Sequence, residues 1–306
     1  MAGGQERALR RRIKSVQSTK KITKAMELIA ASRIVKAQAR VAAARPYSEQ
    51  ITEVIRNLTA AGAGSDQPLL TPRDEVRTVA FVVIAGDRGL AGGYNSGVIR
   101  TAERALLAEQ AAGRDYALIL VGKKANAYFK FRGYKIDAVF TGFADTPSYE
   151  NARTVASDVV ARFERGEVDE VQLVYTQFLS VATQRLQNRR FLPMEAAEMT
   201  ATTGAGTGAK DGPSADYEFE PGPSEILSQI VPRYVESRLF AAMLDSTASF
   251  WAAQQRAMKS ATDNADELIK VLTRSMNRAR QDSITSEIIE IASGAEALAQ
   301  DVRSDD

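Results

Sequence analysis

The stretch "FAAMLDSTASFWAAQQRAMKSATDNADELIKVLTRSMNRA", residues 240–279, contains neither glycine nor proline and repeats its apolar and small residues every three or four positions. Alternating four- and three-residue steps make a heptad repeat, the pattern of a coiled coil. The stripe runs through Phe240, Leu244, Thr247, Trp251, Gln254, Met258, Ala261, Ala265, Leu268, Leu272, Ser275 and Ala279. The helical pattern as a whole covers 225–306, which is too long for one compact domain, so we expect this helix to need a long partner.

The apolar stripe changes register beyond Ala279. A continued heptad would reach Asp282 and Ser286, but the apolar positions resume at Ile284 instead. The second stripe contains Ile284, Ile288, Ile291 and Leu298. Such a stutter-like discontinuity changes the supercoiling locally, and it leaves a second apolar face in need of a partner.

Residues 1–59 form the other long helical pattern. Between Gln5 and Leu58 there is no glycine, and Pro46, where we expect a kink or a break, is the one proline. The expected apolar face contains Ile13, Val16, Ile22, Met26 and Ile29, and later Tyr47, Ile51, Val54 and Leu58. We predict that the terminal helices pair as an antiparallel coiled coil, although the same stripes also fit helices packed compactly beside a sheet.

Residues 76–199 have the alternating pattern of an α/β domain. The apolar runs "RTVAFVVIAG", "YALILVG" and "IDAVFTG" each end in glycine, and helical stretches lie near 95–113, 123–132 and 148–165. "EVQLVYTQF" follows as another strand, and "SVATQRLQNRRFLPM" fits an edge strand or hairpin. The fold class is therefore α/β, with a Rossmann-like domain and a largely parallel sheet inserted between the two coiled-coil helices.

Two segments lack the apolar residues of a folded element. Residues 60–75 contain turn formers and are expected to be a linker. Residues 200–224 are rich in Gly, Thr, Ala and Pro, so we predict a mobile surface loop.

The composition removes several classes of chemistry. The chain has 306 residues and neither Cys nor His, which excludes thiol nucleophiles, imidazole bases, disulfides and Ser-His-Asp triads. Carboxylate-only Mg or Ca sites remain open, but the acidic residues of the middle domain show no spacing that would pair them over a substrate. We predict no catalytic residue, no cofactor and no metal.

The charge is uneven along the chain. Residues 1–45 contain twelve Lys or Arg and two Glu, although the whole chain has a net charge of only +2. A basic arm suggests an acidic partner, which could be nucleic acid, anionic lipid or acidic protein loops. No aromatic residue precedes Ala44 to stack on a base, so we expect no nucleic acid. No apolar run approaches the length of a membrane span, and we expect a cytosolic chain with indirect membrane contact.

The sequence "GDRGLAGGYN", residues 86–95, lies between an expected strand and an expected helix, where a phosphate-binding loop would be placed. Its glycines Gly86, Gly89, Gly92 and Gly93 match neither common phosphate-loop spacing, and no Lys follows them. We interpret the segment as a tight turn that uses glycine for its backbone angles. Asp87 and Arg88 are expected to form a local ion pair or a helix cap.

Four motifs, in order, resemble the gamma subunit of F-type ATP synthases. They are "KSVQSTKKITKAMELIAASRI" (14–34), "GDRGLAGGYN" (86–95), "PRYVESRLFAAM" (232–243) and "AMKSATDNADELIKVLTRSMNRARQDSITSEIIEIASGAEAL" (257–298). The resemblance spans essentially the whole chain. The sequence departs from the family at Ala91, where many members have Cys, at "DNAD", at Gln254, and in extra loop length at 204–214.

The resemblance implies a non-catalytic central-stalk subunit. In this family the terminal helices form a shaft inside a ring of alpha and beta subunits, and the α/β domain forms a foot on the membrane c-subunit ring beside the epsilon subunit. Rotation of the membrane ring turns the shaft, and the shaft drives ATP synthesis in the catalytic ring. The expected location is the cytoplasmic face of the bacterial cell membrane, as a peripheral protein.

The resemblance also implies contacts with the catalytic ring. Met26, beside Lys24, matches the family position that faces an acidic loop of a catalytic subunit. Arg280, Gln281, Thr285 and Glu287 match a polar contact motif. Ile284, Ile288, Ile291 and Leu298 match the apolar end that turns within a collar of the ring.

Overall fold

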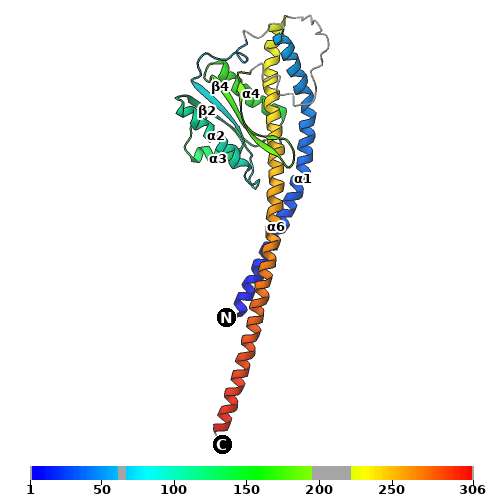
Figure 1. Ribbon diagram of the computed structural model, residues 1–306, viewed down its shortest axis with the longest axis vertical. Helices are drawn as coiled ribbons and strands as arrows, with labels where there is room; N and C mark the ends of the chain where they lie inside the picture. Colours follow the sequence, from blue (N-terminus) through cyan, green and yellow to red (C-terminus); the bar gives the residue numbers. More distant parts are fainter. Residues whose placement is uncertain (1, 61–66, 195–221, 305–306) are drawn as a thin grey trace. The chain divides into compact units, whose positions relative to one another are not determined.

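The computed structural model describes residues 2–60, 67–194 and 222–304, and Figure 1 shows its long terminal helices and its α/β domain. The terminal helices are α1 (Ala2–Ala60) and α6 (Pro223–Ser304). α1 continues as a helix through Pro46, so the break considered at this proline is absent. The α/β domain contains β1 (Thr78–Ile84), α2 (Tyr94–Ala111), β2 (Asp115–Val121), α3 (Lys123–Phe131), β3 (Ala138–Phe140), α4 (Tyr149–Glu164), β4 (Glu170–Phe178) and β5 (Gln184–Leu192).

The contacts divide the chain into two compact units. The first consists of Met1–Ile29 together with Gln255–Asp306, and the second is Ala30–Gln254. The first unit therefore holds parts of both terminal helices, whereas the second holds the remaining parts of these helices and the whole α/β domain.

The sheet of the second unit has the strand order β3-β2-β1-β4-β5. β1 pairs in parallel with β2 and β4, and β2 pairs in parallel with β3. β5 lies at the edge and is antiparallel to β4, which agrees with the expected edge strand. Because the parallel strands end at the same edge, the loops that follow β1, β2 and β3 come together there.

Both faces of this sheet are covered. On one face α2 and α3 enclose apolar side chains such as Phe81, Leu118 and Phe129. On the other face α4 packs together with the parts of α1 and α6 that belong to this unit, around residues such as Ile55, Phe163 and Tyr234. Six of the seven residues of β1 are buried, as expected for a central strand covered on both sides. The expectation of an inserted Rossmann-like domain is confirmed.

In the first unit the two terminal helices pair with each other. The hydroxyl oxygens of Thr23 and Thr262 lie 2.8 Å apart in a hydrogen bond, and Lys20 forms an ion pair with Asp266. Moving back along α1 from 23 to 20 therefore moves forward along α6 from 262 to 266. The two helices are antiparallel here, as predicted.

The face that α1 uses differs from the expected one. Ile22 and Ile29 are 60% and 55% exposed, so this part of the predicted stripe is wrong. Less exposed positions from Ile13 onward instead follow alternating steps of three and four through Ile13, Val16, Lys20, Thr23, Glu27, Ala30, Ile34 and Ala37, and the half-buried Met26, Ala31 and Gln38 lie beside this line. The expected step from Val16 to Ile22 spans six residues, which rotates the side chain away from the face that contains Val16.

The predicted stripe on α6 is closer to the observed one. Met258, Ala265, Leu272 and Ala279 are buried as expected. Between them, however, Thr262, Ile269 and Met276 are less exposed than Ala261, Leu268 and Ser275, so these three intermediate positions move by one residue. The alternation of four and three is unchanged.

The buried threonine pair allows a test of the antiparallel register. Replacing Thr23 with valine should cost about 1 kcal/mol of the free energy of unfolding, because the Thr262 hydroxyl loses a buried partner. Replacing Thr262 as well removes both hydroxyls and should cost little more. Urea unfolding of the two single variants and the double variant measures the coupling. Fully additive effects would contradict a direct contact between these hydroxyls.

Candidate functional site: the helix ends and the glycine-rich turn

The predicted ring-contact residues of α6 lie on an exposed stretch of helix. Every described side chain from Ile284 to Ala295 is exposed, and so are Arg280 and Gln281. Ile284, Ile288 and Ile291 are 50%, 60% and 73% exposed, and Ile289 beside them is 58% exposed. The side chain of Leu298 lies outside the described residues. An apolar surface of this kind on a helix end is typical of a contact with another protein.

The predicted contact residues of α1 lie elsewhere on the helix pair. Lys24 donates to both carboxylate oxygens of Glu27 at 3.1 Å, and Met26 is half-buried. Since Thr23 faces Thr262, Lys24 is about five helical turns along the pair from Arg280. The structure therefore gives two separate candidate contact surfaces in this unit rather than one.

The glycine-rich turn of the second unit connects β1 to α2. Gly92 has a positive φ of 55°, and so does Leu90 with 63°. Gly93 is the N-cap residue of α2, and Gly89 lies over the side chain of Lys124. Gly86 donates its N–H to the side-chain oxygen of Asn95 at 2.9 Å, which closes the turn.

Asp87 binds the backbone of two neighbouring loops. One carboxylate oxygen accepts the N–H of Lys123, at the start of α3, and the other accepts the N–H groups of Gly142 and Ala144; all three distances are 3.0 Å. In α/β proteins that bind phosphate, the anion commonly accepts backbone N–H groups at a helix N-terminus on this edge of the sheet. Here the carboxylate of Asp87 accepts the hydrogen bonds of these three N–H groups instead.

Arg88 pairs with Asp145 and not with its neighbour Asp87. Its Nε lies 2.7 Å from a carboxylate oxygen of Asp145. Burial raises the pKa of the Asp145 carboxyl, and the positive charge of Arg88 opposes this shift. The local ion pair considered for Asp87 and Arg88 is therefore replaced by two separate interactions, each with a residue more than 30 positions away.

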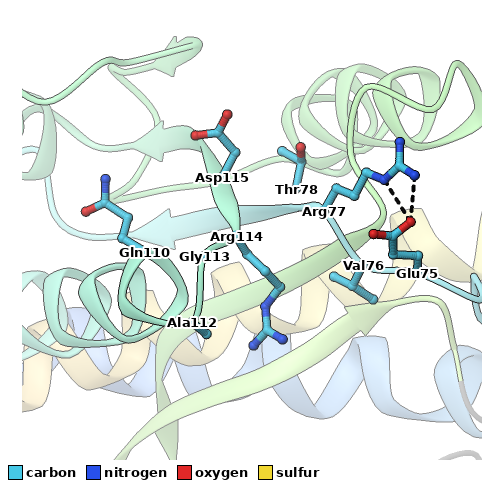
Figure 2. A pocket seen from close by; sticks show the side chains of 9 residues that line it. All are labelled: Glu75, Val76, Arg77, Thr78, Gln110, Ala112, Gly113, Arg114 and Asp115. Atoms are coloured by element: carbon cyan, nitrogen blue, oxygen red, sulfur yellow. Dashed lines mark hydrogen bonds and ion pairs between the residues drawn. The ribbon is translucent and has the colours of Figure 1, made fainter.

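A polar hollow of about 810 Å³ lies at the opposite edge of the sheet, where β1 and β2 begin. Figure 2 shows the ion pair of Arg77 and Glu75 at one end of the hollow and Gln110 at the other. Ligands of open α/β sheets bind beyond the carboxyl ends of the strands, so this hollow is on the edge that such ligands do not use.

The parts of the chain that the structure describes contain no group of three or more acidic residues that could hold a metal ion. Within the same residues, no helix is both long and apolar enough to span a membrane.

The chain has a Rossmann-like domain and two long terminal helices, and the exposed apolar end of α6 is typical of a protein that contacts other subunits. A family model described as ATP synthase matches residues 5–298. The ATP synthase gamma chain of Frankia casuarinae is 52% identical over 300 residues, which cover 97% of this chain and 98% of the relative. That of Kineococcus radiotolerans is 48% identical over 301 residues and 97% of each chain. The chain belongs to the ATP synthase gamma chain family.

Solved structures have the same fold. A chain from the Euglena gracilis mitochondrial ATP synthase, in a structure titled OSCP/F1/c-ring, rotational state 3, matches with a TM-score of 0.64 at 17% identity. The match covers 97% of this chain and 95% of the Euglena chain. A chain from the central stalk and c-ring of the Tetrahymena thermophila enzyme matches with a TM-score of 0.57 at 21% identity.

The residues that make the contacts inside each unit were not predicted from the sequence. Lys20 and Thr23 continue the three-four spacing from Ile13 and Val16, so counting spacing rather than apolar character would have found them. The three backbone partners of Asp87 have no comparable signal, because they lie 36 to 57 positions away in the sequence.

Proposed function

We propose that this chain is the central-stalk rotor subunit of a proton-translocating ATP synthase and couples rotation of the membrane ring to ATP synthesis. The observation that carries the proposal is membership of the gamma chain family over nearly the whole length of the chain. The antiparallel helix pair with an exposed apolar end supports it, since a shaft needs two stiffened helices and a tip for the ring to hold.

The coupling follows from asymmetry. α1 and α6 have different sequences, and α6 continues past the residues that α1 can face, so the helix pair has no rotational symmetry. Such a shaft presents different side chains to equivalent catalytic sites around it. It can therefore favour a different conformation at each site, and rotation exchanges these conformations.

The chemistry belongs to the ring subunits, and this chain is non-catalytic in the proposal. Its partners are the alpha and beta subunits, the epsilon subunit and the c-subunit ring. It would lie on the cytoplasmic face of the bacterial membrane, where its contact with lipid is indirect.

We assign the exposed end of α6 to the ring collar. Ile284, Ile288 and Ile291 would turn against apolar side chains of the ring, with Leu298 beyond them. The polar residues Arg280, Gln281, Thr285 and Glu287 would make and break hydrogen bonds with ring loops during rotation. The basic arm of α1 would complement acidic ring loops, and this attraction should weaken as salt is added.

Replacing Met26 with lysine should uncouple ATP hydrolysis from proton pumping. A cation at this position would form an ion pair with the acidic loop of a catalytic subunit, and a pair of about 1 kcal/mol that must break at every step slows coupled rotation about fivefold. ATP that is hydrolysed before the pair breaks then moves no protons, so proton pumping per ATP, measured in membrane vesicles with a pH-sensitive dye, should fall. Met26→Gln, which is neutral and of similar length, is the control and should pump normally.

Affinity purification from bacterial membranes tests the proposal as a whole. A tagged full-length chain expressed in its own host should bring down alpha, beta, epsilon and c subunits together after mild detergent extraction. Recovery of the chain alone, from membranes that retain active ATP synthase, would contradict a rotor role.

A further inference from the structure

Membership of the family does not explain the role of the glycine-rich turn, residues 86–95. This turn occupies the edge of the sheet where α/β folds bind ligands, but the carboxylate of Asp87 fills the position of a ligand anion. Three backbone N–H groups on one carboxylate form charge-assisted hydrogen bonds, which are shorter and stronger than neutral ones. The turn therefore binds other segments of this chain instead of a ligand. Its contacts identify the element that it holds.

The loop that Asp87 holds is bonded in turn to α6. Ala144 donates its N–H to Asp87, and its carbonyl oxygen lies 2.9 Å from the Thr247 hydroxyl, which shares its hydrogen between this oxygen and the carbonyl oxygen of Met243 at 2.8 Å. Thr247 is a buried residue of α6. A continuous path of two hydrogen bonds thus leads from the end of β1 through Ala144 to α6.

A second path leads from the same turn to the same part of α6. The Tyr94 hydroxyl donates to the carbonyl oxygen of Ser246 at 3.0 Å, and the Tyr94 ring packs edge-on against Phe250, with 5.5 Å between centroids. Phe250 also lies over Gly86, where an added Cβ would come within 3.1 Å of the phenylalanine ring. Residues 246–250, about one turn of α6, are therefore held from three points.

We propose that Asp87 is the positioning residue of a clasp that fastens α6 to the sheet and passes torque between the α/β domain and this helix. The clasp is defined as Gly86, Asp87, Tyr94, Ala144 and Thr247. The inference rests on the proposed rotor function, in which the α/β domain is driven by the membrane ring and α6 belongs to the shaft. A compliant joint at this place would store rotation as twist instead of delivering it to the shaft.

The matched control is Asp169, whose carboxylate also accepts backbone N–H groups but, among the described residues, is not on a hydrogen-bonded path to α6. Its carboxylate accepts the N–H groups of Arg77 and Thr78 at 2.9 and 3.0 Å, at the opposite edge of the sheet. Asp87→Asn and Asp169→Asn both replace an anion that holds backbone N–H groups. Only the first of them interrupts the path to α6.

The experiment measures torsional stiffness in the assembled complex. The catalytic ring is fixed to glass, and a bead is attached to the α/β domain through Arg104→Cys, an exposed position of α2 in a chain without cysteine. The angular variance of the bead during a pause is inversely proportional to the stiffness. Asn has one acceptor oxygen, so Asp87→Asn loses the acceptor for Lys123 or for Gly142 and Ala144, and the bonds that remain are no longer charge-assisted. We expect the variance to rise about twofold. Asp169→Asn should leave it at the wild-type value.

Equal variance for Asp87→Asn and Asp169→Asn would overturn the clasp. If Asp87→Asn does not assemble, Thr247→Val replaces it, because it keeps the size of the side chain and removes the hydroxyl that contacts the carbonyl oxygens of Ala144 and, within α6, of Met243. An increase in variance for this variant supports the clasp, and an unchanged variance overturns it. A wild-type complex that does not rotate the bead would refute the rotor function itself, so the two failures are distinguishable.

Discussion

Replacing Gly122 with alanine should destabilise the α/β domain by at least about 3 kcal/mol. Gly122 lies between β2 and α3 with a φ of 103°, and a Cβ there would come within 2.2 Å of the carbonyl oxygen of Ala85. Neither group can move easily, because Ala85 donates its N–H to Val121 and Gly122 donates its N–H to Phe140. The variant must therefore shift the ends of β1 and β2 apart.

Gly113→Ala is the control that measures the cost of a positive φ alone, without a steric overlap of the added Cβ. Gly113 also has a positive φ, of 79°, but its added Cβ would meet nothing within 4 Å. This control should lose only about 1–2 kcal/mol, the usual cost of the left-handed region for a residue with a side chain. Urea unfolding of the full chain can be followed by the fluorescence of Trp251, which is buried and is the one tryptophan. Equal losses for the two variants would show that the contact with Ala85 relaxes freely.

The α/β domain could be predicted from the sequence because its signals are local. The three apolar runs that end in glycine correspond to β1, β2 and β3, and each glycine marks the place where a strand gives way to a loop or a helix. Gly122 and Gly142 both have positive φ, which is the reason that glycine is required there. The order of the strands depends on contacts between distant segments, and no local pattern determined it.

The helix pair shows where apolar patterns mislead. On α6 the buried residues are mostly apolar or small, so the stripe found by hydrophobicity differs from the real one by at most one residue. On α1 the contact positions include Lys20 and Thr23, and apolar residues such as Ile22 are exposed instead. Polar residues can occupy the interface because Lys20 and Thr23 have specific partners on α6, which sequence alone does not reveal.

Both considered arrangements of the terminal helices occur, each in its own unit. In the second unit Ile51 and Leu58 of α1 and Leu227 and Leu239 of α6 belong to one core with the sheet. In the first unit the helices contact each other through positions such as Thr23 and Thr262. The heptad repeat runs along both parts of α6 and cannot separate them, because a stripe of the same period serves a helix partner or a sheet face equally well.

Replacing Ile284, Ile288 and Ile291 together with serine should abolish tight binding to the catalytic ring and leave the chain folded. These side chains are at least half exposed, so their replacement should change the free energy of unfolding by less than about 0.5 kcal/mol each. If the ring collar buries them, each loses about 1.5–3 kcal/mol of binding free energy, and the three together weaken binding roughly a thousandfold or more.

The matched control replaces exposed apolar residues of the α/β domain, Leu107, Phe131 and Val139, with serine. It removes a similar amount of exposed apolar surface from the α/β domain, which does not enter the ring collar in the proposed function. Titration of each full-length variant into alpha and beta subunits, followed by calorimetry, gives the affinities. Wild-type affinity for the triple isoleucine variant would show that the exposed end of α6 does not enter the ring. Loss of affinity in the control would show that apolar surface in general, rather than the tip of the helix, holds the complex together.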